Sequence, residues 1–167
     1  MLEDVTLRKA VEFAIQTERL GASCYERFAK TFAEDNEIQE IFSRLARDEA
    51  AHEEQFQALL DKVPDKKDEP QRYAEKYGIL KAWSISAFFS KRDGLSRALE
   101  GVRTRDDALQ RALELEKATL GFYQALQDEL RDEPVLGAII AAEKQHLTTL
   151  MNVLSTGVKF RGLGETF

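Results

Sequence analysis

The chain has 167 residues, of which 43% are hydrophobic and 32% are charged, and this balance excludes an intrinsically disordered protein. Its net charge of -6 argues against a nucleic-acid-binding surface, and no apolar stretch approaches the roughly 20 residues that a membrane span needs. The single cysteine excludes an internal disulfide, and the N-terminus lacks the form of a signal peptide, so we expect one cytoplasmic domain over residues 1–167.

The first predicted helix pair covers residues 5–62. Its first helix should run from about Val5 to Ala33, because apolar side chains recur there at helical spacing with Glu18 among them. A short polar turn follows, and the apolar stripe of the second helix includes Glu49 and His52. Because the turn is short, the two helices should form an antiparallel hairpin.

The predicted crossover at residues 63–103 is long and changes character along its length. It begins with the polar, proline-containing segment Val63–Pro70 and continues to the apolar segment Trp83–Phe89, which should be buried. Leu95–Gly101 is predicted to form a short helix. A long crossover of this kind joins the two halves of some four-helix bundles.

The second predicted helix pair covers residues 104–156. Thr104 can cap its first helix, with Asp107 three residues later as a weaker form of the usual capping-box glutamate. Pro134 marks the start of the last helix, since proline is tolerated in a first turn. We expect this helix to end where the glycine-containing tail 157–167 begins, and the tail to pack over one end of the bundle.

Both histidines of the chain stand three residues after a glutamate, in the pairs Glu49-x-x-His52 and Glu143-x-x-His146. Residues at i and i+3 share one face of an α-helix. A carboxylate and an imidazole placed in this way can hold one metal ion, and two such helices that face each other can hold two.

A glutamate and a tyrosine repeat upstream of these motifs. Glu18 precedes Tyr25 by the same spacing as Glu116 precedes Tyr123, and alanine stands four residues before each glutamate. A constant shift in residue number superimposes the first of these segments on the second, and a different shift superimposes the two Glu-x-x-His motifs. The chain is therefore predicted to be an all-α four-helix bundle, built from two repeated helix hairpins that a long crossover joins.

The four glutamates lie on apolar stripes, and this placement predicts a metal centre. Buried carboxylates are costly because desolvation penalises the charged form. Two divalent cations would neutralise them and could lie about 3.5–4 Å apart between bridging carboxylates. Oxygen and nitrogen ligands suit iron, manganese or zinc and argue against copper(I) or an iron–sulfur cluster. The predicted ligands are Glu18, Glu49, His52, Glu116, Glu143 and His146.

The chain resembles the rubrerythrin-like branch of the ferritin-like superfamily in four motifs, namely Glu18…Tyr25, Glu49-x-x-His52, Glu116…Tyr123 and Glu143-x-x-His146. The resemblance implies a ferritin-like bundle with two iron ions that react with hydrogen peroxide or dioxygen. The sequence has no four-cysteine rubredoxin module, so the electron donor should be external. Thr119 stands where rubrerythrins often place an additional glutamate ligand, and this departure argues against redox-linked ligand switching.

Three further residues could form hydrogen bonds to the ligand side chains and so orient them. Tyr25 and Tyr123 are either plain core aromatics or donors to the ligating carboxylates, since a buried phenol needs a partner. Asp48 could orient a histidine, although Ala142 stands at its counterpart in the second half. Glu53 and Glu114 are rival acids that we place in solvent.

Three classes of function remain open from the sequence. The first is an oxidoreductase that reduces hydrogen peroxide or dioxygen with an external donor, the second is an iron-handling ferroxidase, and the third is a structural bundle that holds zinc, without redox chemistry, or no metal. We expect a homodimer, with a complete site in each chain favoured over exchange of helix pairs, and neither nucleic acid nor membrane as a partner.

Overall fold

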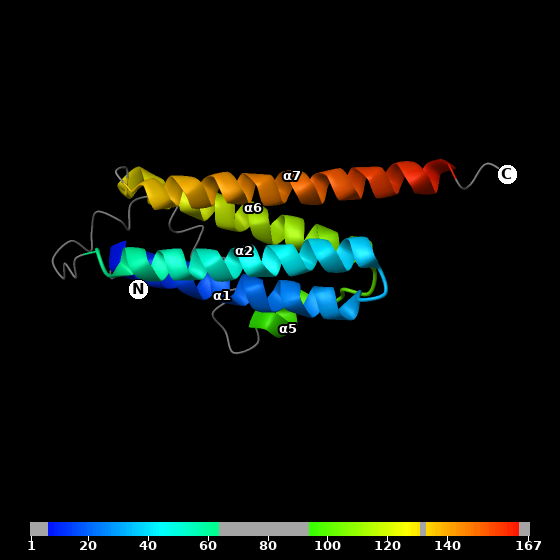
Figure 1. The fold of residues 1–167 in the computed structure, drawn as a ribbon, viewed down its shortest axis with the longest axis horizontal. Coiled ribbons are helices and arrows are strands. Elements are labelled where there is room, and N and C mark those ends of the chain that lie inside the picture. Colours follow the sequence, from blue (N-terminus) through cyan, green and yellow to red (C-terminus); the bar gives the residue numbers. More distant parts are fainter. Residues whose placement is uncertain (1–6, 64–93, 131–132, 164–167) are drawn as a thin grey trace.

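The computed structural model describes residues 7–63, 94–130 and 133–163, and these form an all-α bundle (Figure 1). Two antiparallel hairpins pack together, and a short helix lies against the first of them. The predicted fold of two hairpins is therefore confirmed. The helices are α1 (Leu7–Thr31), α2 (Asn36–Leu60), α5 (Gly94–Leu99), α6 (Arg105–Glu129) and α7 (Pro134–Leu163).

Two predicted features, one in the crossover and one at the N-terminus, lie outside the described residues. These are the apolar segment Trp83–Phe89 and the first residues of the chain, before Leu7. The short helix predicted at Leu95–Gly101 is confirmed as α5.

Side-chain caps begin both α2 and α6. Asp35 accepts a hydrogen bond from the backbone N–H of Ile38 at 3.2 Å, which satisfies one free donor of the first turn of α2. Thr104 and Asp107 form a reciprocal capping box at the start of α6, as the sequence predicted. Arg105 then donates to Asp35 at 2.9 Å, so the starts of α2 and α6 are tied together across the two hairpins.

Two hydrophobic clusters fill the bundle, one toward each end. Along every long helix, residues of one cluster are followed by acidic or imidazole side chains and then by residues of the other cluster. A buried polar layer therefore lies between two apolar layers. The fully buried side chains of the first cluster include Val11, Phe56, Leu126 and Ile139, and those of the second include Phe28, Phe42, Leu109 and Leu150.

The prediction that the last helix ends near Gly157 was wrong. α7 continues to Leu163 and extends past the ends of the other helices (Figure 1). Glycine costs a helix interior about 1 kcal/mol relative to alanine, but it keeps its backbone N–H and so does not break the helix as proline does. No proline follows Pro134 in the sequence. The predicted tail 157–167 is therefore largely helix.

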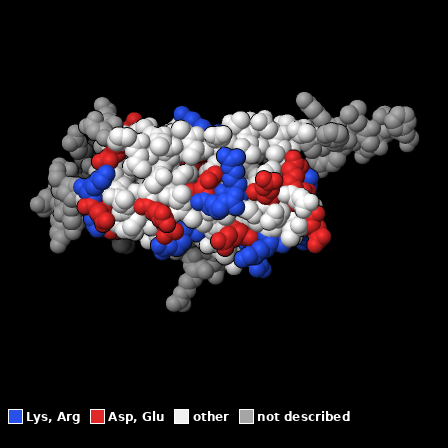
Figure 2. All heavy atoms as spheres, viewed as in Figure 1, with Lys and Arg blue, Asp and Glu red and all other residues white. Residues whose placement is uncertain are grey.

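The surface carries charges of both signs. Figure 2 shows acidic and basic side chains beside one another over α1 and α2, with fewer charged side chains over α7 in the same view. Nowhere in the described part of the chain is there a helix both long and apolar enough to cross a membrane.

Candidate metal centre

Each of the four long helices directs one glutamate into the buried polar layer. Glu18 comes from α1, Glu49 from α2, Glu116 from α6 and Glu143 from α7, and each of them is at most 4% exposed. The two histidines, on α2 and α7, are each 5% exposed. All six predicted ligands therefore converge in one layer, because each helix holds its polar residues at the same height between the two apolar clusters.

The six residues form two groups that could each hold a metal ion. One group, here called the first position, contains Glu18 and His52, and the other, the second position, contains Glu116 and His146. Both groups also contain Glu49 and Glu143. Within each group the candidate ligand atoms lie within 4.8 Å of one another. Glu49 and Glu143 are therefore placed to bridge two ions.

The distances show how the imidazoles face the carboxylates. At the first position, Nδ1 of His52 lies 3.0 Å from Oε1 of Glu143 and 3.4 Å from Oε2 of Glu18. At the second position, Nδ1 of His146 lies 3.4 Å from Oε2 of Glu116 and 3.5 Å from Oε1 of the α2 glutamate. Both rings therefore turn the same nitrogen toward the carboxylates.

Six buried polar atoms in this layer make no hydrogen bond within the described structure, and each of the six residues supplies one of them. A buried polar atom without a partner costs about 1–3 kcal/mol, and such atoms are rare in folded proteins. Their convergence shows that the layer fits a pair of cations, which would satisfy all six at once. The atoms are Oε2 of Glu18, Oε1 of Glu49, Nδ1 of His52, Oε2 of Glu116, Oε1 of Glu143 and Nδ1 of His146.

The surroundings shift the pKa values of these groups strongly. Burial raises the pKa of Glu18 and Glu143 well above the ordinary carboxyl value, and neighbouring carboxylates add to the effect. Burial alone would lower the pKa of His52, but the nearby carboxylates of Glu143 and Glu18 raise it to about 12. Contacts with carboxylates likewise outweigh burial at His146 and raise its pKa to about 11. Without metal, protons therefore compensate the buried negative charge, and they must leave when imidazole binds a metal ion.

Two tyrosines hold the outer carboxylates from across the bundle. The phenol of Tyr25 on α1 donates to Oε1 of Glu116 on α6 at 2.6 Å, and the phenol of Tyr123 on α6 donates to Oε1 of Glu18 on α1. The sequence left open whether these tyrosines were plain core aromatics, and the structure shows both as donors. Helical spacing could not show that each phenol serves the opposite hairpin.

Asp48 lies beside one histidine only. Its Oδ2 is 3.3 Å from Nε2 of His146, and Arg44 lies 3.7 Å from the same oxygen. In the second hairpin Ala142 occupies the matching position. The structure therefore brings Asp48 to the second position and places no described carboxylate beside Nε2 of His52.

Sequence reasoning missed one position that bears on the site. A Cβ on Gly21 would lie 3.6 Å from Oε2 of Glu49, at ordinary contact distance. The repeat pairs Gly21 with Thr119, whose hydroxyl lies 3.4 Å from Oε2 of Glu143. Comparing the two repeats at this register would have identified Gly21.

The rival acids lie outside both groups. Glu53 accepts a hydrogen bond from Arg19 at 2.9 Å at the exposed edge of the α1–α2 hairpin. Glu114 is exposed and pairs with Arg111. Cys24 is buried in an apolar cluster, and burial raises the pKa of its thiol to about 12.

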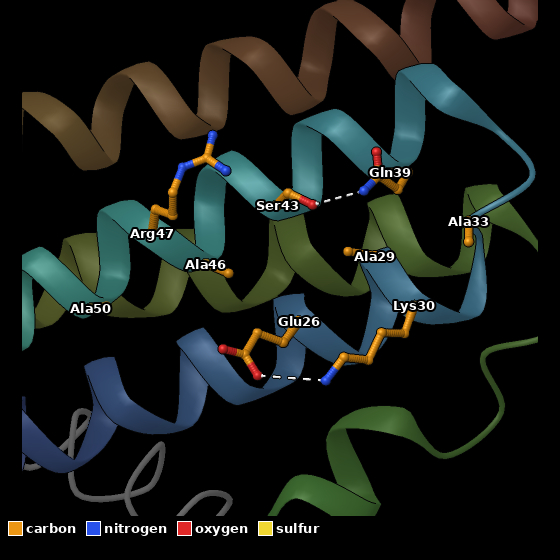
Figure 3. A pocket seen from close by; sticks show the side chains of 9 residues that line it. All are labelled: Glu26, Ala29, Lys30, Ala33, Gln39, Ser43, Ala46, Arg47 and Ala50. Atoms are coloured by element: carbon orange, nitrogen blue, oxygen red, sulfur yellow. Dashed lines mark hydrogen bonds and ion pairs between the residues drawn. The ribbon is translucent and has the colours of Figure 1, made fainter.

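A surface hollow between α1 and α2 is separate from the buried layer. It has a volume of about 510 Å³, and Figure 3 shows four alanines and a few polar side chains along it. The ion pair between Glu26 and Lys30 and the hydrogen bond between Gln39 and Ser43 belong to its walls. None of the six converging residues lines this hollow.

Comparison with known proteins assigns the family. The family model for Rubrerythrin matches residues 9–154, which covers α2 and α6 in full and most of α1 and α7. No curated protein and no solved structure matches the chain. Since the match spans most of the sequence and includes the whole buried Glu/His layer, the chain belongs to the rubrerythrin family.

Proposed function

We propose that the chain holds two iron ions in the buried Glu/His layer and reduces hydrogen peroxide or dioxygen with electrons from an external donor. The observation that carries this proposal is the set of six unpartnered atoms, arranged in two groups that share Glu49 and Glu143. Bound iron would supply the electrons that break the O–O bond. The proposed ligands are Glu18, Glu49, His52, Glu116, Glu143 and His146.

The protein contributes charge balance and positioning. Four carboxylates balance the charge of two divalent ions and the two imidazoles bind as neutral ligands, so the loaded layer would be close to neutral. The phenols of Tyr25 and Tyr123 each leave one oxygen of an outer carboxylate free to face the ions. The apolar clusters on both sides limit access of bulk water to this layer.

The proposed donor is a separate redox protein. Cys24 is the only cysteine in the sequence, so these residues cannot form a four-cysteine electron-transfer centre. We also propose a homodimer with a complete site in each chain. Light scattering at micromolar concentration tests the dimer, and a monomer mass with and without metal would contradict it.

A second candidate function is oxidation of ferrous iron by dioxygen, as an iron-handling protein. Thr119 favours it, because this residue stands where rubrerythrins often have an additional glutamate ligand. A threonine hydroxyl is a weaker ligand than a carboxylate, so redox-linked exchange of ligands is not available at this position.

Stopped-flow absorbance after anaerobic loading with ferrous ion separates the candidates. We expect oxidation by hydrogen peroxide to be faster than oxidation by dioxygen if the protein is a peroxide reductase. Faster oxidation by dioxygen would favour the ferroxidase, and no oxidation by either would leave a zinc-holding bundle. Glu114→Gln is the matched control, since it removes an exposed acid from α6 that lies outside both groups.

A further inference from the structure

The two metal positions have matched ligands but unequal surroundings. Each position has one outer glutamate, one histidine and the same two shared glutamates. Each outer glutamate also accepts a hydrogen bond from one tyrosine of the opposite hairpin. The ligands and their tyrosines therefore give no reason for one position to bind metal more tightly than the other.

The first difference concerns the ring nitrogen of each histidine that points away from the cluster. His146 has the carboxylate of Asp48 at 3.3 Å from Nε2, the ring nitrogen that faces away from the cluster. Ala142 occupies the corresponding position on α7, so His52 has no such partner among the described residues. A carboxylate that accepts the outer N–H of a ligating imidazole fixes its orientation and makes the inner nitrogen a stronger donor to metal.

The second difference lies beside the shared glutamates, on the side of the second position. The hydroxyl of Thr119 lies 3.4 Å from Oε2 of Glu143, the oxygen nearer to His146, and 3.1 and 3.2 Å from two backbone carbonyls of its own helix. Its counterpart Gly21 has no side chain to place beside Oε2 of Glu49, the oxygen that lies 3.9 Å from His52. Both extra polar contacts therefore fall on the second position.

We propose that the two positions bind divalent metal unequally, and that the second position, formed by Glu116 and His146 with the shared glutamates, fills first. Asp48 is the positioning residue responsible. This inference rests on the proposed dinuclear centre. Loss of such an outer partner of a metal-bound histidine typically weakens metal binding about 10–100-fold, so a difference of at least about tenfold between the two positions is expected.

Anaerobic titration with cobalt(II), followed by visible absorbance and calorimetry, tests the order of filling. The wild-type protein should bind two ions in two separate phases. Glu116→Gln and Glu18→Gln are matched variants, because the repeat places these glutamates at corresponding positions. Glu116→Gln should abolish the tight phase, and Glu18→Gln should abolish the weak one.

Two further variants test Asp48 itself. Asp48→Asn keeps the shape of the side chain, removes its charge and should weaken the tight phase about 10–100-fold while the weak phase changes little. Ala142→Asp should tighten the weak phase, since it places a carboxylate at the matching position behind His52. Glu54→Gln is the control, because it removes an exposed acid from the same helix and should leave both phases unchanged.

The outcomes separate this inference from the proposal on which it rests. Two ions bound in one phase, with Asp48→Asn equal to wild type, would overturn the unequal positions and leave the dinuclear centre standing. Loss of the tight phase in Glu18→Gln instead of Glu116→Gln would overturn the assigned order. Failure of the wild-type protein to bind cobalt at all would overturn the dinuclear centre together with this inference.

Discussion

The α1–α2 hairpin and the α6–α7 hairpin give the buried layer the same side chains from the same registers. Each contributes one outer glutamate, one Glu-x-x-His motif and one tyrosine. The two hairpins differ around that layer, because Asp48 corresponds to Ala142 in the repeat and Gly21 corresponds to Thr119. The repeat therefore preserves the candidate ligands, whereas the residues beside those ligands differ between the two hairpins.

The largest expected effect comes from variants that remove a shared glutamate. Glu49→Gln and Glu143→Gln each remove a carboxylate that both positions use, so each variant should retain close to no metal after dialysis. Glu18→Gln removes a carboxylate of one position only and should retain about one ion per chain. Metal analysis by plasma emission measures these contents. A Glu49→Gln protein that keeps as much metal as Glu18→Gln would show that the carboxylate is not shared.

Removing the metal tests the buried ionisable groups that both hairpins contribute. In the metal-free protein the pKa values of Glu18, Glu143, His52 and His146 all lie above their ordinary values, so the folded state holds protons that the unfolded chain releases. The stability from the histidines is complete below about pH 6.5 and is lost as the pH rises toward about 11 and 12. The stability from the carboxyls has the same sign and is lost from lower pH upward.

Metal-free protein should therefore unfold more easily at pH 9 than at pH 6. We expect each of the two histidines to account for a loss of about 3 kcal/mol, so the melting temperature should fall by about 6 °C or more, measured by circular dichroism. The metal-loaded protein is the control and should show a smaller fall, because ions then replace the protons. A metal-free melting temperature that is unchanged or higher at pH 9 would contradict the buried cluster.

Variants of the two tyrosines compare single hydrogen bonds to the outer glutamates of the two hairpins. Tyr25→Phe and Tyr123→Phe each remove one phenol that donates to a buried carboxylate of the other hairpin. Each should lower the free energy of unfolding by about 1.5–3 kcal/mol, which urea denaturation of the metal-free protein measures. A neutral result for one variant would show that the two halves do not support their outer glutamates alike.

The smallest expected effect concerns the helix starts. Thr104→Ala removes the cap of α6 and should cost about 1 kcal/mol of stability. Asp35→Ala removes the cap of α2 together with the partner of Arg105, so it should cost slightly more. Thermal unfolding of the two variants side by side measures the difference. Equal losses would mean that the contact between Arg105 and Asp35 adds nothing to stability.

The sequence predicted the fold well because its signals were local and repeated. Helical periodicity, the cap at Thr104 and the proline at Pro134 located the helices of the second hairpin, and the repeat indicated how the hairpins are arranged. The end of α7 was predicted wrongly at Gly157, because a single glycine lowers helix propensity without interrupting the helix.

The candidate site was predictable in its members but not in their connections. Spacing placed Glu49 and His52 on one face of a helix, and the same holds for their counterparts. Spacing within one helix could not reveal that Glu49 belongs to both groups, or that Tyr25 serves a carboxylate on α6. Those relations depend on how far one hairpin slides along the other, which only the packed bundle determines.

Anomalous diffraction from crystals loaded with zinc would show whether two metal ions bind within the one cluster of glutamates and histidines. We expect two peaks about 3.5–4 Å apart, with nitrogen and oxygen ligands at about 2.0–2.2 Å. One peak should lie beside Glu18 and His52, the other beside Glu116 and His146, with the carboxylates of the α2 and α7 glutamates between them. Peaks only at the surface, or an empty buried layer under saturating zinc, would show that the six residues do not form a dinuclear metal centre.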